Sequence, residues 1–289
     1  MIGAGIMGSG IAQLAAMHDH AVRLHDLDDA AIGTGLASID RSLARFERKD
    51  RLGGVGPAAV RSRITATTDL AEAVQGAEVV IEAVSERLEL KRQVFAEVRA
   101  HAPSEALLGT NTSQLSITAI ATALGDDADR LVGMHFFNPP VVMRLCELVR
   151  GVRTSDAMLE RARRFAETLD KTVVVCRKDS PGFITSRAYA MLRLECLRML
   201  DEGVASAEDI DTAMKLGFNL PMGPLELGDF NGLDTYLHAV EGLADAYGER
   251  FRPTVGLRNM VAAGLLGRKS GEGFYRYDGE GNRLGGSPT

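Results

Sequence analysis

Gly3-Ala4-Gly5-Ile6-Met7-Gly8, at the start of the chain, is the stretch that decides the fold of the N-terminal part. Its glycines have the spacing of a dinucleotide-binding turn: the first allows a tight turn, the second lets the backbone approach a pyrophosphate, and the third lets helix and strand pack closely. Residues 9–17 carry apolar side chains at helical spacing, so a helix should follow and direct its N-terminal N–H groups and positive dipole end at the phosphates. We therefore expect Gly3, Gly5, Ile6, Met7 and Gly8 to bind a dinucleotide.

Asp26 follows the next apolar stretch, residues 21–25, at the expected end of a second strand. A carboxylate in this place accepts hydrogen bonds from a ribose 2′-hydroxyl and repels a 2′-phosphate, so the cofactor is expected to be NAD rather than NADP. The alternative, a glycine-rich turn in a loop, would leave both the helix and Asp26 unexplained. Only Met1 and Ile2 precede Gly3, whereas a strand in this position normally has ~5 residues. We therefore expect the chain to start inside a truncated first strand.

The composition excludes several classes of protein. The chain has 289 residues, 45% hydrophobic and 25% charged, which is enough for two domains with substantial cores. The net charge is −6 and no basic cluster occurs, so nucleic acid is not an expected partner. No apolar run reaches the ~20 residues that span a bilayer, and no signal peptide opens the chain. These features predict a cytoplasmic protein that does not bind membranes.

The pattern of apolar residues divides the chain into two parts. Up to about residue 178, short apolar runs alternate with helical stretches, which is typical of a parallel sheet with crossover helices. Strands are expected at 77–84, 106–110, 131–136, 142–149 and 172–176, with helices at 88–100 and 158–169. Strand patterns then disappear, and helices are expected at 183–201, 207–216, 234–247 and 253–263, followed by a tail from 279. The sequence thus predicts a doubly wound Rossmann-type α/β domain over 1–179 and an all-helical domain over 180–289.

Two side chains at or near strand ends could carry acid–base chemistry. His135 ends the strand 131–136, and ligands bind at the carboxyl ends of strands in open α/β sheets. Glu147 lies between Cys146 and Leu148, an apolar setting in which a carboxylate needs a partner. A carboxylate that accepts a hydrogen bond from one imidazole nitrogen leaves the other nitrogen as a base. The alternatives are a core histidine and an edge-strand charge facing water.

Ser113 follows the strand 106–110 and so also lies at a carboxyl end; its alternative role is to cap the helix that begins near Ile117. A hydrolase triad of Ser113, His135 and Glu147 would leave the dinucleotide turn unexplained, and the chain has no GxSxG elbow. A second cluster, His18, Asp19, His20 and His25, lacks a recognised metal-ligand spacing, so these are expected to be surface residues and no metal site is predicted.

Taken together, these residues resemble the L-3-hydroxyacyl-CoA dehydrogenase family, in its short form called 3-hydroxybutyryl-CoA dehydrogenase. The resemblance covers nearly the whole chain and includes long, family-specific strings: GAGIMGSGIA at 3–12, IEAVSERLELK at 81–91, NTSQLSIT at 111–118, GMHFFNPPVVM at 133–143, DSPGF at 179–183, EDIDTAMKLG at 208–217, PMGPLELGDFNGLD at 221–234 and GRKSGEGFY at 267–275.

The resemblance implies a role for individual residues. His135 would be the general base, Glu147 its partner, Ser113 a donor to the substrate's 3-oxygen, and Asn138 a neighbour of the nicotinamide. Cofactor-side contacts are implied for Glu86, Lys91 and Lys269, and contacts to coenzyme A for Ser42 and Lys49. The last two are seven residues apart and are expected on one helix face, as a phosphate grip. One position departs from the family pattern: Ser186 stands before Arg187 where relatives usually have Asn at a substrate-site position.

These features predict reversible, NAD-dependent oxidation of an (S)-3-hydroxyacyl-CoA, with a second domain that completes the substrate cleft and mediates homodimerisation, as the family implies. Two alternatives stay open. A dehydrogenase of a free hydroxy acid or sugar acid on the same fold would not need Ser42 and Lys49. A non-catalytic NAD-binding protein would keep the glycines and should lose His135 and Glu147.

Overall fold

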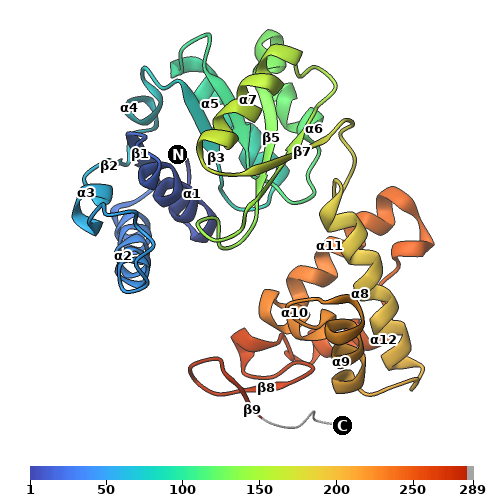
Figure 1. Ribbon diagram of the computed structural model, residues 1–289. Helices are drawn as coiled ribbons and strands as arrows, with labels where there is room; N and C mark the ends of the chain where they lie inside the picture. The colour runs from blue at the N-terminus through green and yellow to red at the C-terminus, as the bar shows by residue number, and fades with distance from the viewer. Residues whose placement is uncertain (285–289) are drawn as a thin grey trace. The chain divides into compact units, whose positions relative to one another are not determined.

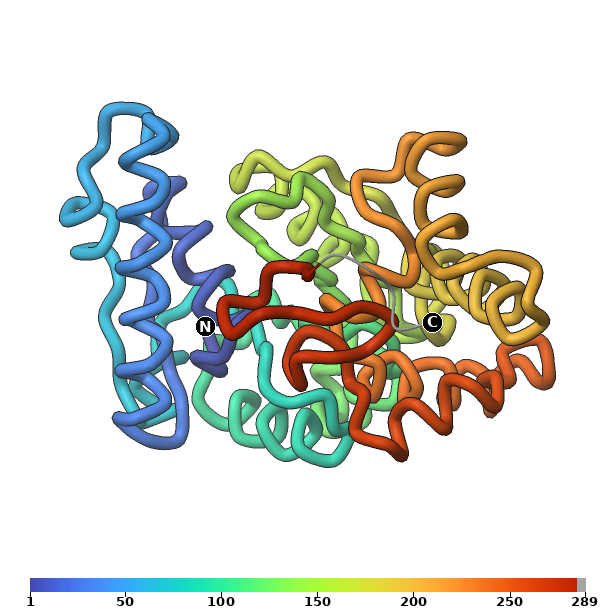
Figure 2. The backbone as a smooth tube through the Cα atoms, turned by 90° about the horizontal axis from the view of Figure 1, so that it is seen from below, coloured from blue at the N-terminus to red at the C-terminus, as the bar shows by residue number. Residues whose placement is uncertain are grey.

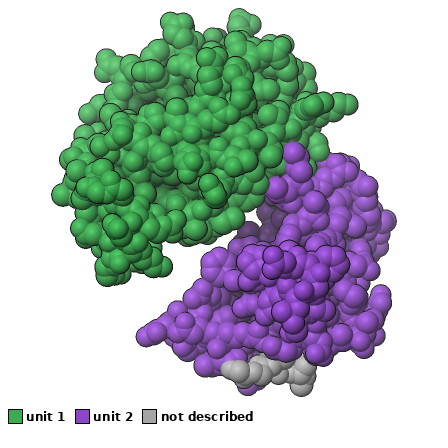
Figure 3. Space-filling model, in the orientation of Figure 1, with its two compact units in different colours: residues 1–183 green, residues 184–289 purple. Residues whose placement is uncertain are grey.

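The structure, a computed structural model, describes residues 1–284, and the chain forms two compact units, 1–183 and 184–289 (Figure 3). Each unit is considered by itself. Within the described residues, no helix combines the length and the apolar character needed to cross a membrane.

Unit 1 is built on a sheet with helices on both faces (Figure 1). Along the sheet, β2 pairs with β1, Ile2 bridges β1 and β3, and the order then continues from β3 through β4, β5 and β6 to β7. The strands are β1 (Val22–His25), β2 (Ile64–Thr67), β3 (Val79–Glu82), β4 (Leu107–Thr110), β5 (Leu131–Phe136), β6 (Leu145–Val149) and β7 (Thr172–Cys176). Those expected from residue 77 onward are all present, mostly with shorter bounds.

Two sets of helices enclose the sheet and explain its apolar strands. Side chains of α1 (Ile6–Met17) and α7 (Asp156–Thr168) form one core cluster with β3 to β6. A second cluster lies on the other face, where α4 (Leu70–Val74), α5 (Leu88–His101) and α6 (Ile117–Ala121) pack on the sheet. A sheet covered on both faces is the doubly wound arrangement that the sequence predicts. The remaining elements of the unit are α2 (Asp29–Glu47), which packs beside α1 (Figure 2), α3 (Pro57–Arg61) and the 3₁₀ helix η1 (Thr122–Arg130).

Ile2 lies between the two parts of the sheet and bridges them: on the β1 side, the Met1 carbonyl accepts the His25 N–H at 2.9 Å and the Gly3 N–H donates to the His25 carbonyl at 2.8 Å, and on the β3 side Ile2 itself makes the bonds. Its N–H donates to the Ile81 carbonyl at 2.9 Å, its carbonyl accepts the Ala83 N–H at 2.8 Å, and its side chain is 1% exposed. A cavity of about 650 Å³ adjoins Met1, and residues of α1, β1 and β3 contribute to its lining, among them Ile11, Ala15, Val22, Val79 and Ile81. The backbone before Gly3 therefore has strand pairing on both sides, as expected, over a short stretch.

The sheet differs from the expected parallel pattern in one respect: β6 runs antiparallel to β5. The connection 137–144 is too short to hold the crossover that a parallel neighbour requires. The antiparallel register sets His135 directly opposite Glu147.

Unit 2 is helical over most of its described length. The helices that the sequence predicts here are present, close to their expected bounds, and α10 is an additional helix. The helices are α8 (Thr185–Asp201), α9 (Ala207–Phe218), α10 (Pro224–Asn231), α11 (Leu233–Tyr247) and α12 (Val255–Ala262), with the 3₁₀ turns η2 (Glu249–Phe251) and η3 (Arg268–Ser270).

The expectation of an all-helical second domain needs one correction. Two short strands, β8 (Arg276–Tyr277) and β9 (Arg283–Leu284), pair antiparallel. Strands of two residues are too short to produce an alternating pattern of apolar and polar residues, so the sequence does not predict them. The expected tail from 279 therefore includes part of this hairpin, and its last residues, 285–289, lie outside the described part of the chain.

Candidate active site

The glycine turn has the geometry of a phosphate-binding loop. Gly3 has a φ of +96°, and a Cβ on Gly8 would lie 1.9 Å from the Gly3 carbonyl oxygen, so neither position tolerates a side chain. Around the site of a Cβ on Gly5, by contrast, there is no atom within 4 Å. The Gly5 backbone therefore faces open space at the N-terminus of α1, where free N–H groups and the helix dipole favour an anion.

Asp26 is held beside this turn by its own hydrogen bonds. The carboxylate accepts the Ala4 N–H at 2.6 Å and the Leu27 N–H at 2.8 Å, one on each oxygen. Since a carboxylate has about four acceptor positions, capacity remains for ribose hydroxyls. Two apolar side chains in this region, Ile6 and Leu27, are 77% and 83% exposed. Turn, carboxylate and apolar surface together fit a dinucleotide without a 2′-phosphate.

His135 and Glu147 form a buried pair on β5 and β6. His135 Nδ1 lies 3.1 Å from Glu147 Oε2, and the side chains are 8% and 0% exposed. The water-facing position considered for Glu147 is therefore excluded. Opposite residues of an antiparallel pair project to the same face of the sheet, which is why two positions 12 residues apart meet.

This contact decides which imidazole nitrogen is available. A carboxylate oxygen only accepts, so Nδ1 carries the proton and donates it to Glu147, and Nε2 of the neutral ring is left as a base. The ring also lies 4.4 Å from that of Phe137 and 5.9 Å from that of Phe183. His135 is thus an oriented base in largely apolar surroundings at the carboxyl end of β5.

Ser113 and Asn138 lie on the loops that follow β4 and β5, and both side chains are exposed. The helix-capping role considered for Ser113 belongs to Ser116, whose Oγ accepts the Ala119 N–H at the start of α6. A hydrogen bond holds the Ser113 backbone in place, because its N–H donates to Glu86 Oε1 at 2.9 Å.

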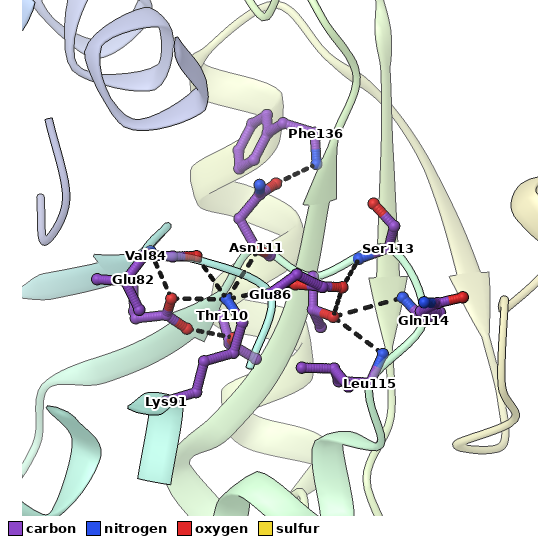
Figure 4. Close-up of polar contacts among 11 residues, drawn as sticks. Glu82, Val84, Glu86, Lys91, Thr110, Asn111, Ser113, Gln114, Leu115 and Phe136 are labelled. Atoms are coloured by element: carbon purple, nitrogen blue, oxygen red, sulfur yellow. Dashed lines mark hydrogen bonds and ion pairs between the residues drawn. The ribbon is translucent and has the colours of Figure 1, made fainter. Parts of the chain in front are cut away.

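Glu86 and Lys91 belong to a polar network under this loop (Figure 4). The Glu86 carboxylate also accepts the Thr112 hydroxyl at 2.5 Å and lies 3.6 Å from Lys91 Nζ. Glu86 is 34% exposed, whereas the Lys91 side chain is fully buried. Cofactor contacts by these two residues remain predictions.

The network contains four polar residues that the sequence does not single out: Glu82, Thr110, Asn111 and Thr112. Glu82 ends β3, is fully buried and pairs with Lys91 at 2.7 Å. It stands among Val80, Ile81 and Ala83 much as Glu147 stands among Cys146 and Leu148. The same argument, that a carboxylate in an apolar strand needs a partner, could have identified it.

The two residues expected to contact coenzyme A do not share a helix face. Ser42 lies on α2 and is 8% exposed, whereas α2 ends at Glu47 and Lys49 is exposed beyond it. The expectation that Ser42 and Lys49 share one helix face is therefore wrong, because α2 ends between the two positions. Their contacts with substrate remain predictions.

Ser186 and Lys269 belong to unit 2. Ser186 lies half-buried in the first turn of α8. Lys269 Nζ lies 2.6 Å from the Asp234 carboxylate, and this hydrogen bond lowers the pKa of Asp234.

Comparison with known proteins agrees with these features. Residues 1–180 match the 3-hydroxyacyl-CoA dehydrogenase NAD binding domain, and residues 182–277 match the C-terminal domain of the same family. The chain is 44% identical over 278 residues to the probable 3-hydroxybutyryl-CoA dehydrogenase of Deinococcus radiodurans, covering 96% of this chain and 99% of that one. It is 42% identical over 283 residues to the 3-hydroxybutyryl-CoA dehydrogenase of Bradyrhizobium diazoefficiens, covering 96% and 94%.

Among solved structures, the (S)-3-hydroxybutyryl-CoA dehydrogenase of Ralstonia eutropha superimposes with a TM-score of 0.91 at 40% identity, covering 96% of this chain and 97% of that one. Together, the two domain matches cover residues 1–180 and 182–277, and the relatives align over nearly their full length. The chain therefore belongs to the 3-hydroxyacyl-CoA dehydrogenase family.

Proposed function

We propose that this chain is an NAD-dependent 3-hydroxyacyl-CoA dehydrogenase that interconverts an (S)-3-hydroxyacyl-CoA, such as 3-hydroxybutyryl-CoA, and the corresponding 3-oxoacyl-CoA. The observation that carries the proposal is the buried His135–Glu147 pair at the carboxyl end of β5, in the same unit as the glycine turn and Asp26. The names of the relatives support a coenzyme A thioester as the substrate. The glycine turn and Asp26 would hold the dinucleotide, which would supply a hydride acceptor for C3 in oxidation and, as NADH, a hydride donor in reduction.

Side chains of the protein itself are proposed to transfer the proton of the 3-hydroxyl group. In oxidation, His135 Nε2 takes the proton of the 3-hydroxyl group, and the imidazolium that forms is stabilised by the Glu147 carboxylate at Nδ1. In reduction, the protonated ring donates to the 3-carbonyl oxygen instead. The Ser113 hydroxyl is proposed to bond the same oxygen, and Ser186 is proposed as a weaker substrate contact.

Cofactor contacts are assigned in the same way. The N–H groups behind Gly5 would hold the pyrophosphate, Asp26 the ribose hydroxyls, and Asn138 would lie beside the nicotinamide. Glu86 and Lys269 are proposed as further contacts, and Ser42 and Lys49 as contacts with coenzyme A.

We further propose that the enzyme is a cytoplasmic homodimer. Unit 2 has large apolar side chains on its surface, among them Leu216 and Phe218, which are 83% and 72% exposed. Exposed apolar side chains of this size favour burial against a partner. Sedimentation velocity should give the mass of a dimer, and a monomer at micromolar concentration would contradict this part.

The proposal is tested by following NADH oxidation with acetoacetyl-CoA beside free acetoacetate. A kcat/KM for the thioester at least 100-fold above that for the free acid is expected. A preference for the free acid would favour a hydroxy-acid dehydrogenase, and NADH binding without turnover of either substrate would favour a non-catalytic protein.

A further inference from the structure

A buried ion pair joins Glu82, at the end of β3, to Lys91 in the first turn of α5, and it takes no part in the proposed proton transfer (Figure 4). Lys91 Nζ is 2.7 Å from Glu82 Oε1, and both side chains are 0% exposed. The Thr110 hydroxyl donates to the other carboxylate oxygen of Glu82 at 2.6 Å. Burial raises the pKa of Glu82, and the Lys91 ammonium opposes that rise. A fold in which apolar residues of similar size replace a buried ion pair is often just as stable. The distinctive contribution of this pair is therefore the fixed direction of its hydrogen bonds.

Those hydrogen bonds use the full capacity of the ammonium group, which has three N–H donors. Besides Glu82, Lys91 Nζ is 3.3 Å from the Val84 carbonyl and 3.3 Å from the Asn111 carbonyl. Lys91 thus ties together the turns that leave β3 and β4. Each of its three N–H groups thus has an acceptor among the described residues.

Asn111 connects this pair with His135. Its backbone N–H donates to the Glu82 carbonyl at 2.7 Å, and its side-chain Oδ1 accepts the Phe136 N–H at 2.9 Å. The ladder between β4 and β5 ends with Thr110 opposite Gly133. The Asn111 side chain therefore supplies the acceptor for the residue that follows His135, after β4 itself has left the sheet.

The same turn carries Ser113. Directly after Asn111, Thr112 donates its hydroxyl proton to Glu86 and accepts the Leu115 N–H at 3.0 Å, and the Ser113 N–H also donates to Glu86. Asn111 is thus the point at which the loop of Ser113 and the strand end of His135 are joined by hydrogen bonds.

We propose that Asn111 is a positioning residue, which sets His135 relative to Ser113, and that the Glu82–Lys91 pair holds Asn111 in place. Lys91 then acts on the site through the two turns and not through a contact with the dinucleotide. The activity readout of this inference rests on the proposed function, whereas the readout by hydrogen exchange does not.

The activity test compares Asn111→Ala, Asn111→Asp and, as a matched control, Asn259→Ala on the exposed surface of α12. Because a displacement of about 1 Å can cost about 100-fold in rate, Asn111→Ala should lower kcat by roughly 10- to 100-fold. The KM for acetoacetyl-CoA and the Kd for NADH should stay within about threefold. Asn111→Asp keeps an acceptor for the Phe136 N–H and should recover part of the loss, while Asn259→Ala should match the wild type. A kcat of Asn111→Ala within twofold of the wild type would overturn the proposal.

Amide hydrogen exchange, followed by NMR, tests the same contact in the absence of substrate. The Phe136 amide should exchange at least about tenfold faster in Asn111→Ala, and the ring signals of His135 should shift. The Val174 amide on β7 serves as the internal reference and should not change. Unchanged protection of Phe136 would refute the role of Asn111 even if the enzyme is active, whereas an inactive wild type with the expected exchange pattern would reject only the proposed function.

The role of Lys91 is tested with the double variant Glu82→Gln/Lys91→Met, which removes both charges together and so leaves no uncompensated buried charge. We expect a lower kcat with the NADH Kd within about threefold of the wild type. An NADH Kd raised tenfold or more at unchanged kcat would assign Lys91 to the cofactor and overturn this part of the proposal.

Discussion

Replacing Glu147 by Gln removes one charge from the proposed site and keeps its shape. The amide oxygen of Gln can still accept the proton on His135 Nδ1, which in the wild type lies 3.1 Å from Glu147 Oε2. Two unit charges about 4 Å apart attract each other by about 4 kcal/mol at an effective dielectric constant of about 20. The imidazolium charge is only partly formed in the transition state, so we expect a loss of ~2–4 kcal/mol, or roughly 30- to 1000-fold in kcat.

The assay is NADH oxidation with saturating acetoacetyl-CoA, combined with the NADH Kd from fluorescence titration. Glu202→Gln, which makes the same chemical change at an exposed position at the end of α8, is the control and should behave as the wild type. If Glu147→Gln turns over within threefold of the wild type, no substantial positive charge develops on His135, and the acid–base reasoning fails.

Four further predictions concern individual residues. Asp26→Ser should narrow the preference for NADH over NADPH, measured as the ratio of kcat/KM values; a wild type that prefers NADPH would contradict the position assigned to the carboxylate. Lys49→Ala should raise the KM for acetoacetyl-CoA several-fold and affect a pantetheine thioester less, since the proposed contact is a partly solvated ion pair with the nucleotide end; equal effects on both substrates would exclude that contact. Ser186→Asn should keep kcat/KM or raise it by up to roughly tenfold, because an added direct hydrogen bond contributes ~0.5–1.5 kcal/mol, and a large loss would mean a pocket built around the smaller side chain. Burial raises the pKa of Asp229 from 3.8 to about 6, so the folded protein keeps a proton that the unfolded chain has released. The free energy of unfolding should therefore fall by about 3 kcal/mol between about pH 4 and 6 through this group, and chemical denaturation of Asp229→Asn should lack that component; an identical pH dependence of the two proteins would contradict it.

Much of the site could be predicted because its residues occupy positions with a simple physical meaning. His135 ends an apolar strand, and Glu147 is a lone carboxylate inside another, so the sequence alone marks each of them as a side chain that needs a partner or a function. Their distance could not be predicted, because it depends on the register of β5 against β6. That register comes from a short connection that forces the two strands to run antiparallel.

The errors have equally local causes. The face shared by Ser42 and Lys49 was inferred from spacing alone, and spacing does not reveal that α2 ends at Glu47. The cofactor contact of Lys91 stays a prediction, but the buried surroundings of this side chain, Glu82 and two carbonyl groups, could not be predicted before β3, β4 and α5 are assembled. Glu82 and Val84 lie within nine residues of Lys91 and Asn111 lies 20 residues away, but these contacts depend on how the turns after β3 and β4 fold against α5, which no pattern within one segment predicts.

The most direct test of the central claim is the turnover of acetoacetyl-CoA by NADH in the wild type and in His135→Ala, at NADH concentrations matched to the Kd of each protein. We predict ready turnover by the wild type and a kcat lower by ~10²–10⁴ in His135→Ala, the usual contribution of a positioned acid–base group, with NADH binding nearly intact. Near-normal turnover by His135→Ala would contradict the assignment of His135 as the base on which the proposed mechanism depends.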